Sequence, residues 1–133
     1  MNFKNILLLP FIFLVGCELD YKDKASTPTP TVASQELTDP NAAAGNEFGN
    51  KTTILTNGNI VVASLKDDTG ASNAGAVHLY NPYTKTLIKS IYGDNTNDYL
   101  GYSGVTALTN NNFVIVSATD DVGGVTDAGS VML

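Results

Sequence analysis

The sequence predicts an all-β protein made of β-propeller-type repeats, with one full four-stranded unit and part of a second. Three observations lead to this prediction. A segment of about 50 residues occurs twice after residue 46, which is the period typical of propeller blades. Short runs of β-branched residues alternate with turns rich in Gly and Asn. No stretch after residue 46 has the spacing of apolar residues expected of an amphipathic helix.

The two copies share a Val-rich run, a pair of aspartates and a Gly-containing step before a third apolar run. In order, the matching segments are 55–64 with 108–117, 67–68 with 120–121, and 74–79 with 128–133. A match of this length does not arise by chance, so it predicts a repeated structural unit.

One unit divides into four short strands. The expected strands are 53–55, 60–65, 76–80 and 87–92, with 113–118 in the second unit. Asn57-Gly58 predicts a tight turn between the first two strands, because both residues tolerate positive φ. The Val- and Ile-rich second strand is expected to be buried on both faces. Alternation places Val77 and Leu79 on one face of the third strand and His78 on the other.

Four short antiparallel strands repeated in this way describe a propeller blade. A β-solenoid is the rival fold, but its coils stack parallel strands, whereas hairpin turns predict antiparallel ones. Propellers close with roughly four to eight blades, and this chain holds one unit and about three strands of another. Either the sequence is a piece of a longer protein or several chains assemble. An end at Leu133, inside the expected third strand, favours the first alternative.

The repeated unit resembles a known family. Phe48-Gly49, Asn59-Ile60-Val61-Val62-Ala63-Ser64 and Gly75-Ala76-Val77-His78-Leu79-Tyr80 are similar to the FG-GAP repeat. The resemblance covers residues 48–133 and implies the β-propeller of integrin α chains and of many bacterial surface proteins. Two positions depart from the pattern. Residues 63–65 read Ala-Ser-Leu where the family has Gly-Ala-Pro, and Leu100 replaces the Phe in the second unit.

The N-terminus has the features of a secretory signal. Lys4 precedes an apolar run over residues 6–16, which is shorter than the roughly 20 residues that a membrane-spanning helix needs. Leu14-Val15-Gly16-Cys17 resembles the lipobox of bacterial lipoproteins. The resemblance implies cleavage before Cys17 and lipid attachment to its thiol, which would hold the protein on a membrane. The alternative is an ordinary signal peptide followed by a cysteine.

The chain therefore divides into three predicted parts. Residues 1–16 form the signal peptide, and residues 17–45 form a lipidated tether rich in Pro, Thr and Ser. Residues 46–133 form the repeats, as unit 46–97 and partial unit 98–133. Glu18 stands where many inner-membrane lipoproteins have Asp, so the resemblance favours the outer membrane or cell surface over the inner membrane.

Composition excludes some functions. The net charge is −6 and the chain contains no arginine, so nucleic acid is not expected as a partner. The lone cysteine allows no internal disulfide. The single histidine, His78, has Met132 as its counterpart and is expected to be a surface or inter-blade residue. No catalytic combination of residues is recognisable, so we do not expect an enzyme.

Acidic loops are the only candidate metal sites. The segment 94–98, Asp-Asn-Thr-Asn-Asp, alternates oxygen-bearing side chains as calcium loops do, which makes Asp94 and Asp98 candidate calcium ligands. The aspartate pairs 67–68 and 120–121 are weaker candidates, because Asp near Gly also caps tight turns. The sequence indicates no cofactor apart from this candidate calcium ion.

The leading hypothesis is a non-catalytic binding or adhesion module, held on the membrane through lipid on Cys17, with a protein or a glycan as ligand. Three alternatives stay open. The chain could be a scaffold lipoprotein of an envelope complex, the non-functional stub of a longer gene, or part of a larger enzyme.

Overall fold

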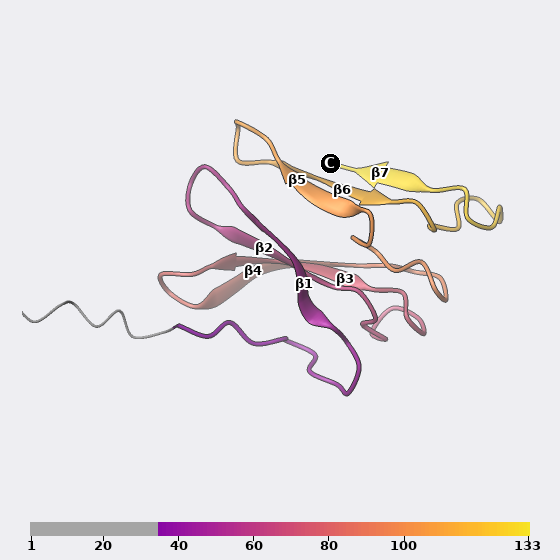
Figure 1. Ribbon diagram of the computed structural model, residues 1–133, viewed down its shortest axis with the longest axis horizontal. Helices are drawn as coiled ribbons and strands as arrows, with labels where there is room; N and C mark the ends of the chain where they lie inside the picture. The colour runs from indigo at the N-terminus through magenta and orange to yellow at the C-terminus, as the bar shows by residue number, and fades with distance from the viewer. Residues whose placement is uncertain (1–34) are drawn as a thin grey trace, which may run out of the picture. The chain divides into compact units, whose positions relative to one another are not determined.

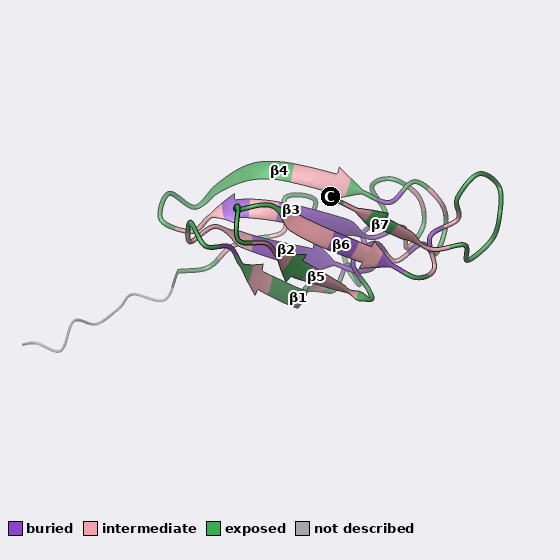
Figure 2. Ribbon diagram, turned by 90° about the horizontal axis from the view of Figure 1, so that it is seen from above, coloured by how far each residue is buried: buried purple, intermediate pink, exposed green. Residues whose placement is uncertain are grey.

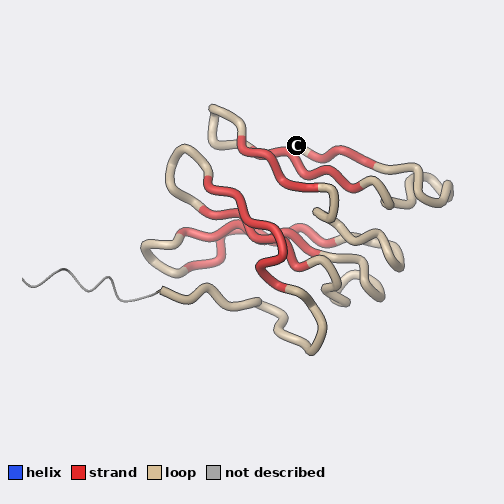
Figure 3. Tube along the Cα trace, viewed as in Figure 1, coloured by secondary structure: helices blue, strands red, loops and turns tan. Residues whose placement is uncertain are grey.

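The computed structural model describes residues 35–133, which contain seven β-strands and no helix (Figures 1 and 3). The first sheet contains β1 (Phe48–Ile54), β2 (Ile60–Ser64), β3 (Ala76–Asn81) and β4 (Thr86–Tyr92), in that order. The second contains β5 (Gly104–Ala107), β6 (Phe113–Ser117) and β7 (Ser130–Met132). All neighbouring strands are antiparallel. The predicted all-β fold, with one four-stranded unit and a partial second, is confirmed.

Part of the sequence interpretation lies outside the described residues. This applies to the signal peptide 1–16, to Cys17 and to the tether as far as residue 34. Within residues 35–133 there is no helix of the length and apolar character that crossing a bilayer requires.

The observed strand bounds agree with the expected ones at β2, β3, β4 and β6 to within a residue. The first strand is longer than expected, because it continues back to Phe48 through a shift of register between Phe48 and Lys51. Gly49, at φ +87°, lies within that irregularity and adopts a backbone conformation that favours glycine. β5, β6 and β7 are the roughly three strands expected of the second unit, although bounds were predicted only for β6.

The tight turns occur where the sequence places them. Between β1 and β2, the N–H of Leu55 donates to the carbonyl oxygen of Asn59 at 2.8 Å, and Gly58 has φ +84°. Between β5 and β6, Leu108 donates to Asn112 in the same way at 2.8 Å. Here Asn111 takes the positive φ, which Asn tolerates better than most residues.

Burial follows the position of each strand (Figure 2). Val61, Val62, Ala63 and Ser64 of β2 are all buried, which confirms the prediction that this strand is covered on both faces. Most residues of β4 are exposed, because it is one of the two edge strands of the first sheet.

A single hydrophobic core joins the two sheets. Its buried side chains come from both repeats and from the loop between them; they are Leu55, Val61, Ala63, Leu65, Val77, Leu100 and Ile115. The Thr53 hydroxyl of β1 also donates a hydrogen bond of 2.7 Å to the carbonyl oxygen of Val105 in β5. The two repeats therefore pack against each other as neighbouring units.

The sequence repeat is also a repeat of hydrogen bonds. In the first unit, Ser64 Oγ donates to the carbonyl oxygen of Asn46 at 3.0 Å, and the Gly75 N–H donates to that of Asp67 at 3.0 Å. The matching bonds in the second unit join Ser117 to Asp98 at 3.1 Å and Gly129 to Asp120 at 2.9 Å.

Candidate functional site

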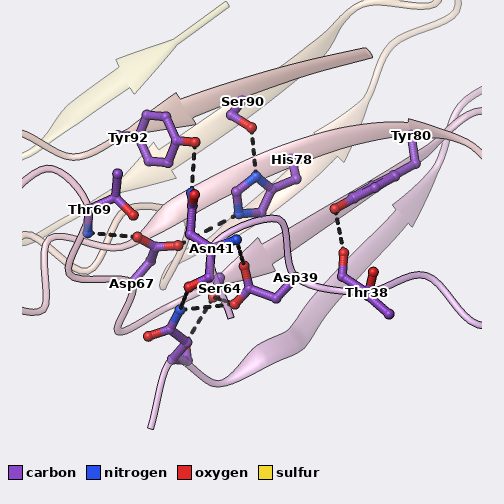
Figure 4. Close-up of polar contacts among 11 residues, drawn as sticks. Thr38, Asp39, Asn41, Ser64, Asp67, Thr69, His78, Tyr80, Ser90 and Tyr92 are labelled. Carbon is purple, nitrogen blue, oxygen red and sulfur yellow. Dashed lines mark hydrogen bonds and ion pairs between the residues drawn. The ribbon is translucent and has the colours of Figure 1, made fainter. Parts of the chain in front are cut away.

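A cluster of polar side chains lies on the face of the first sheet that carries His78 (Figure 4). Alternation along β3 places His78 and Tyr80 on this face, and β4 adds Ser90 and Tyr92. Asp67 comes from the loop that follows β2, and Asp39 comes from the segment before β1. The cluster is thus assembled from four parts of the chain.

The segment 38–46 covers this face of the sheet. Tyr80 Oη donates a hydrogen bond of 2.7 Å to the carbonyl oxygen of Thr38, and Asn41 Nδ2 donates one of 2.9 Å to Tyr92 Oη. Asn46 Nδ2 donates to Asp39 Oδ2 at 2.9 Å. Residues as far as 45 were expected to form the tether. The packed part of the chain instead begins by Thr38, because Thr38 and Asn41 form hydrogen bonds with the tyrosine hydroxyls on this face of the sheet.

His78 is fully buried, with an exposed fraction of 0%. Its ring lies among aromatic side chains, with centroid distances of 6.0 Å to Phe48, 6.0 Å to Tyr92 and 6.4 Å to Tyr80. Of the two expected positions, surface or inter-blade, the surface position was therefore wrong. The cause is the covering segment 38–46 and Phe48, whose packing on β3 no local pattern indicates.

The two ring nitrogens of His78 have different surroundings. Nδ1 lies 2.9 Å from Ser90 Oγ, within hydrogen-bond distance. Nε2 points toward Asp67 Oδ2 at 3.9 Å, which is too long for a hydrogen bond. Burial lowers the pKa of His78 below its ordinary value of 6.5, while the carboxylates of Asp39 and Asp67 act in the opposite direction. Burial thus favours the neutral form of the imidazole.

Asp67 holds the loop between β2 and β3 as well as facing His78. Its Oδ1 accepts the N–H of Thr69 at 2.8 Å, and its carbonyl oxygen accepts the N–H of Gly75. Asp68 Oδ1 accepts the N–H of Asn73 at 2.6 Å. Asp67 and Asp68 therefore make the turn-capping bonds that were the alternative to calcium.

The predicted calcium ligands Asp94 and Asp98 lie close together, and the structure adds Asp120 to them. One carboxylate oxygen from each of the three lies within 4.8 Å of the others. Asp98 is buried, and its Oδ2 and Oδ1 accept the N–H groups of Asn95 at 2.8 Å and Asp121 at 3.1 Å. Asp94 is exposed. Asp98 thus ties the loop after β4 to the loop after β6.

A pocket opens beside these loops. Tyr99 and Tyr102 contribute two rings whose centroids are 6.4 Å apart at 55°. Lys66 Nζ and a Glu47 carboxylate oxygen form an ion pair of 2.6 Å in its wall, and Thr119 adds a hydroxyl. The hydrogen bond and charge of Glu47 raise the pKa of Lys66. Exposed aromatic faces next to polar groups are typical of a binding surface.

Sequence reasoning found only part of these sites. It identified Asp94 and Asp98 but not Asp120 as their neighbour, although Asp120 belongs to the repeated aspartate pair. It did not pair Asp67 with His78, and it placed Asp39 in the tether. Nothing in the sequence signals Asp39, because its contacts depend on how segment 38–46 folds back on the sheet.

Comparison with known protein families gives one match. The family model of the FG-GAP repeat matches residues 32–80, a range that contains β1, β2 and most of β3. No curated protein and no solved structure matches the chain. The chain carries an FG-GAP-type repeat, in agreement with the sequence resemblance. The matched range includes the segment 38–46 that covers His78.

Proposed function

We propose that this chain is a lipid-anchored lipoprotein of the bacterial envelope whose β-propeller-type repeats form a non-catalytic binding module. The lipobox-like sequence at residues 14–17 supports the anchor, and Cys17 is the proposed lipid-bearing residue. The FG-GAP-type repeat and the all-β fold support the module. Glu18 supports the outer membrane or cell surface as its location.

The buried position of the single histidine supports a non-catalytic role. A general acid or base must come within hydrogen-bond distance of its substrate. His78 and Asp67 are both 0% exposed and lie beneath the segment 38–46, which separates them from a substrate in solution. Asp98 is buried too and already accepts two backbone N–H groups.

The observation that carries the binding role is the pocket beside Tyr99 and Tyr102. Tyr102 is 59% exposed although it is a large aromatic side chain. A sugar ring can pack its C–H face on such a ring, while its hydroxyl groups hydrogen-bond to the Glu47–Lys66 pair and to Thr119. We propose a glycan as the ligand, since a concave pocket with aromatic walls and a few hydrogen-bonding groups suits a saccharide better than a flat protein surface.

A binding experiment tests this role. The full chain is applied to an array of bacterial and host glycans, and the affinity of the strongest ligand is measured for the wild type and Tyr102→Ala. We expect Tyr102→Ala to weaken binding by about tenfold, or about 1.4 kcal/mol, as loss of an aromatic anchor typically does.

Tyr83→Ala is the matched control, because Tyr83 is an exposed tyrosine in the turn between β3 and β4, outside the pocket. Equal weakening by the two substitutions would contradict the pocket as the binding site. Capture of a protein in place of any glycan would contradict the glycan ligand.

A scaffold role in an envelope complex is the second candidate. It is favoured by the apolar side chains exposed along the edge strand β4, where Leu87 is 42% and Ile88 is 50% exposed. Exposed apolar side chains on an edge strand are suited to packing against another protein. Cross-linking in intact cells from a residue of β4 would reveal such a partner.

A further inference from the structure

Two buried polar atoms on the His78 face have no hydrogen-bond partner among residues 35–133. They are Asp67 Oδ2 and His78 Nε2, and both side chains are 0% exposed. Leaving such groups unpaired away from water is costly, most of all for a carboxylate. Their separation of 3.9 Å is too long for a direct bond, but it leaves room for an atom that both of them could bind.

Both atoms are held in place by bonds on the opposite side of their groups. Ser90 Oγ lies 2.9 Å from His78 Nδ1, which fixes the ring, and the Thr69 N–H donates to Asp67 Oδ1 at 2.8 Å. When Nδ1 carries the proton and donates it to Ser90, Nε2 presents a lone pair toward Asp67. A neutral imidazole oriented in this way by its second nitrogen is typical of a metal-binding histidine.

Asp39 supplies a third donor. One oxygen of Asp39, one of Asp67 and a ring nitrogen of His78 all lie within 4.8 Å of one another. The Asn41 N–H and Asn46 Nδ2 each donate to Asp39 at 2.9 Å and hold its carboxylate over the sheet (Figure 4).

The charges in the cluster also favour binding of a cation. Asp39 and Asp67 are two carboxylates, and across residues 35–133 no lysine forms an ion pair with either. Asp67 is fully buried with one carboxylate oxygen unpaired, and Asp39 is half-buried beside it, so a divalent cation would compensate both charges.

We propose that Asp39, Asp67 and His78 bind a divalent transition-metal ion, for which Zn²⁺ is the best candidate. One imidazole nitrogen and two carboxylate oxygens are ligands that Zn²⁺ accepts, whereas Ca²⁺ takes oxygen ligands. The site is particular to the first repeat, because Asp120 matches Asp67 in the second but Met132 replaces His78.

The position of the site indicates a structural role. Asp39 lies before β1, while Asp67 and His78 belong to the sheet, so the ion would fasten the segment 38–46 onto the sheet. Zn²⁺ should therefore raise the melting temperature and slow proteolysis within this segment, since a ligand that binds only the folded state stabilises it.

The experiment measures Zn²⁺ retained by the full chain after equilibrium dialysis, with the metal quantified by mass spectrometry. All variants carry Cys17→Ser, which removes the single thiol as a competing ligand. We expect one Zn²⁺ per chain in this background. Asp67→Asn and His78→Gln should each weaken binding by more than about tenfold, because even loss of an outer partner of a ligand costs about that much.

Asp94→Asn is the matched control, since it removes a carboxylate from the other acidic cluster and should retain the ion. Circular dichroism monitors the β structure of each variant. If His78→Gln does not fold, Asp39→Asn takes its place, because Asp39 lies outside the strands. Absence of Zn²⁺ from the Cys17→Ser background, or equal retention by all folded variants, would overturn the proposal.

Discussion

The backbone N–H of Leu100 donates a hydrogen bond of 2.8 Å to the carbonyl oxygen of Ala74. This bond joins the loop before β5 to the loop before β3. Both side chains are buried, and Leu100 belongs to the core shared by the two sheets. The position that the FG-GAP resemblance assigns to Phe thus holds a leucine that packs on the preceding repeat.

Gly75 lies at this junction, and we predict that Gly75→Ala destabilises the protein severely. A Cβ there would lie 2.5 Å from the Leu100 nitrogen and 2.9 Å from the Leu65 carbonyl oxygen, and φ is +79°. The strained φ costs about 1–2 kcal/mol and the overpacking about 1–3 kcal/mol more. Urea denaturation measures the change in the free energy of unfolding. Gly124→Ala is the control, since Gly124 has φ +81° but no atom within 4 Å of the position that a Cβ would take. An equal loss of unfolding free energy in Gly75→Ala and Gly124→Ala would show that the close contacts around Gly75 do not contribute.

Calcium should leave the melting temperature unchanged. Both oxygens of Asp98 already accept backbone N–H groups and so connect two loops, and Asp94 is exposed. The measurement compares melting in the presence of calcium and of a chelator. If calcium did bind, a roughly 100-fold excess over its Kd would add about 2.7 kcal/mol and raise the melting temperature by several degrees. A rise of this size, lost in Asp94→Asn/Asp98→Asn, would establish the calcium site instead.

Cys17→Ala should abolish lipid attachment, because the thiol is the acyl acceptor in the lipoprotein pathway that the sequence resembles. Growth with a labelled fatty acid, followed by isolation of the protein, measures the incorporated label. The variant should also keep residues 1–16, because cleavage follows lipid attachment. The mass of its polypeptide should therefore exceed that of the processed wild-type polypeptide. Equal labelling of the wild type and the variant would refute Cys17 as the anchor.

Stability should fall as the pH rises through 10, in part because of Tyr80. Burial raises the pKa of Tyr80 above its ordinary value of 10.0, with the charge of Asp39 acting in the same direction. The unfolded chain therefore loses this proton at a lower pH than the folded one, so ionisation favours unfolding from pH 10 upward.

Tyr80→Phe isolates this effect. Near neutral pH the variant should be less stable by about 1 kcal/mol, because it lacks the hydrogen bond to Thr38. Above pH 10 the difference should shrink, since phenylalanine does not ionise. Urea denaturation below and above pH 10 measures the difference in the free energy of unfolding between the wild type and Tyr80→Phe. A difference that does not change with pH would exclude a raised pKa of Tyr80.

The repeat, the fold class and most of the strands could be predicted from the order of residues alone. These features depend on local pattern: alternation in β3, the Val-rich run of β2, and Asn-Gly or Asn-Asn at the tight turns. Because both repeats carry the same pattern, each supports the interpretation of the other. The same local reasoning identified Asp94 and Asp98, which are four residues apart in one loop.

The surroundings of His78, by contrast, could be found only from the folded chain. Asp39 is separated from it by 39 positions in the chain and Asp67 by 11, and their meeting depends on segment 38–46 lying over β3. That segment is rich in Ala and polar residues and has no strand periodicity, so its sequence suggests a tether. It packs because its polar groups pair with Tyr80, Tyr92 and Ser64 across the sheet face, and hydrogen bonds between distant residues leave no periodic signal in a sequence.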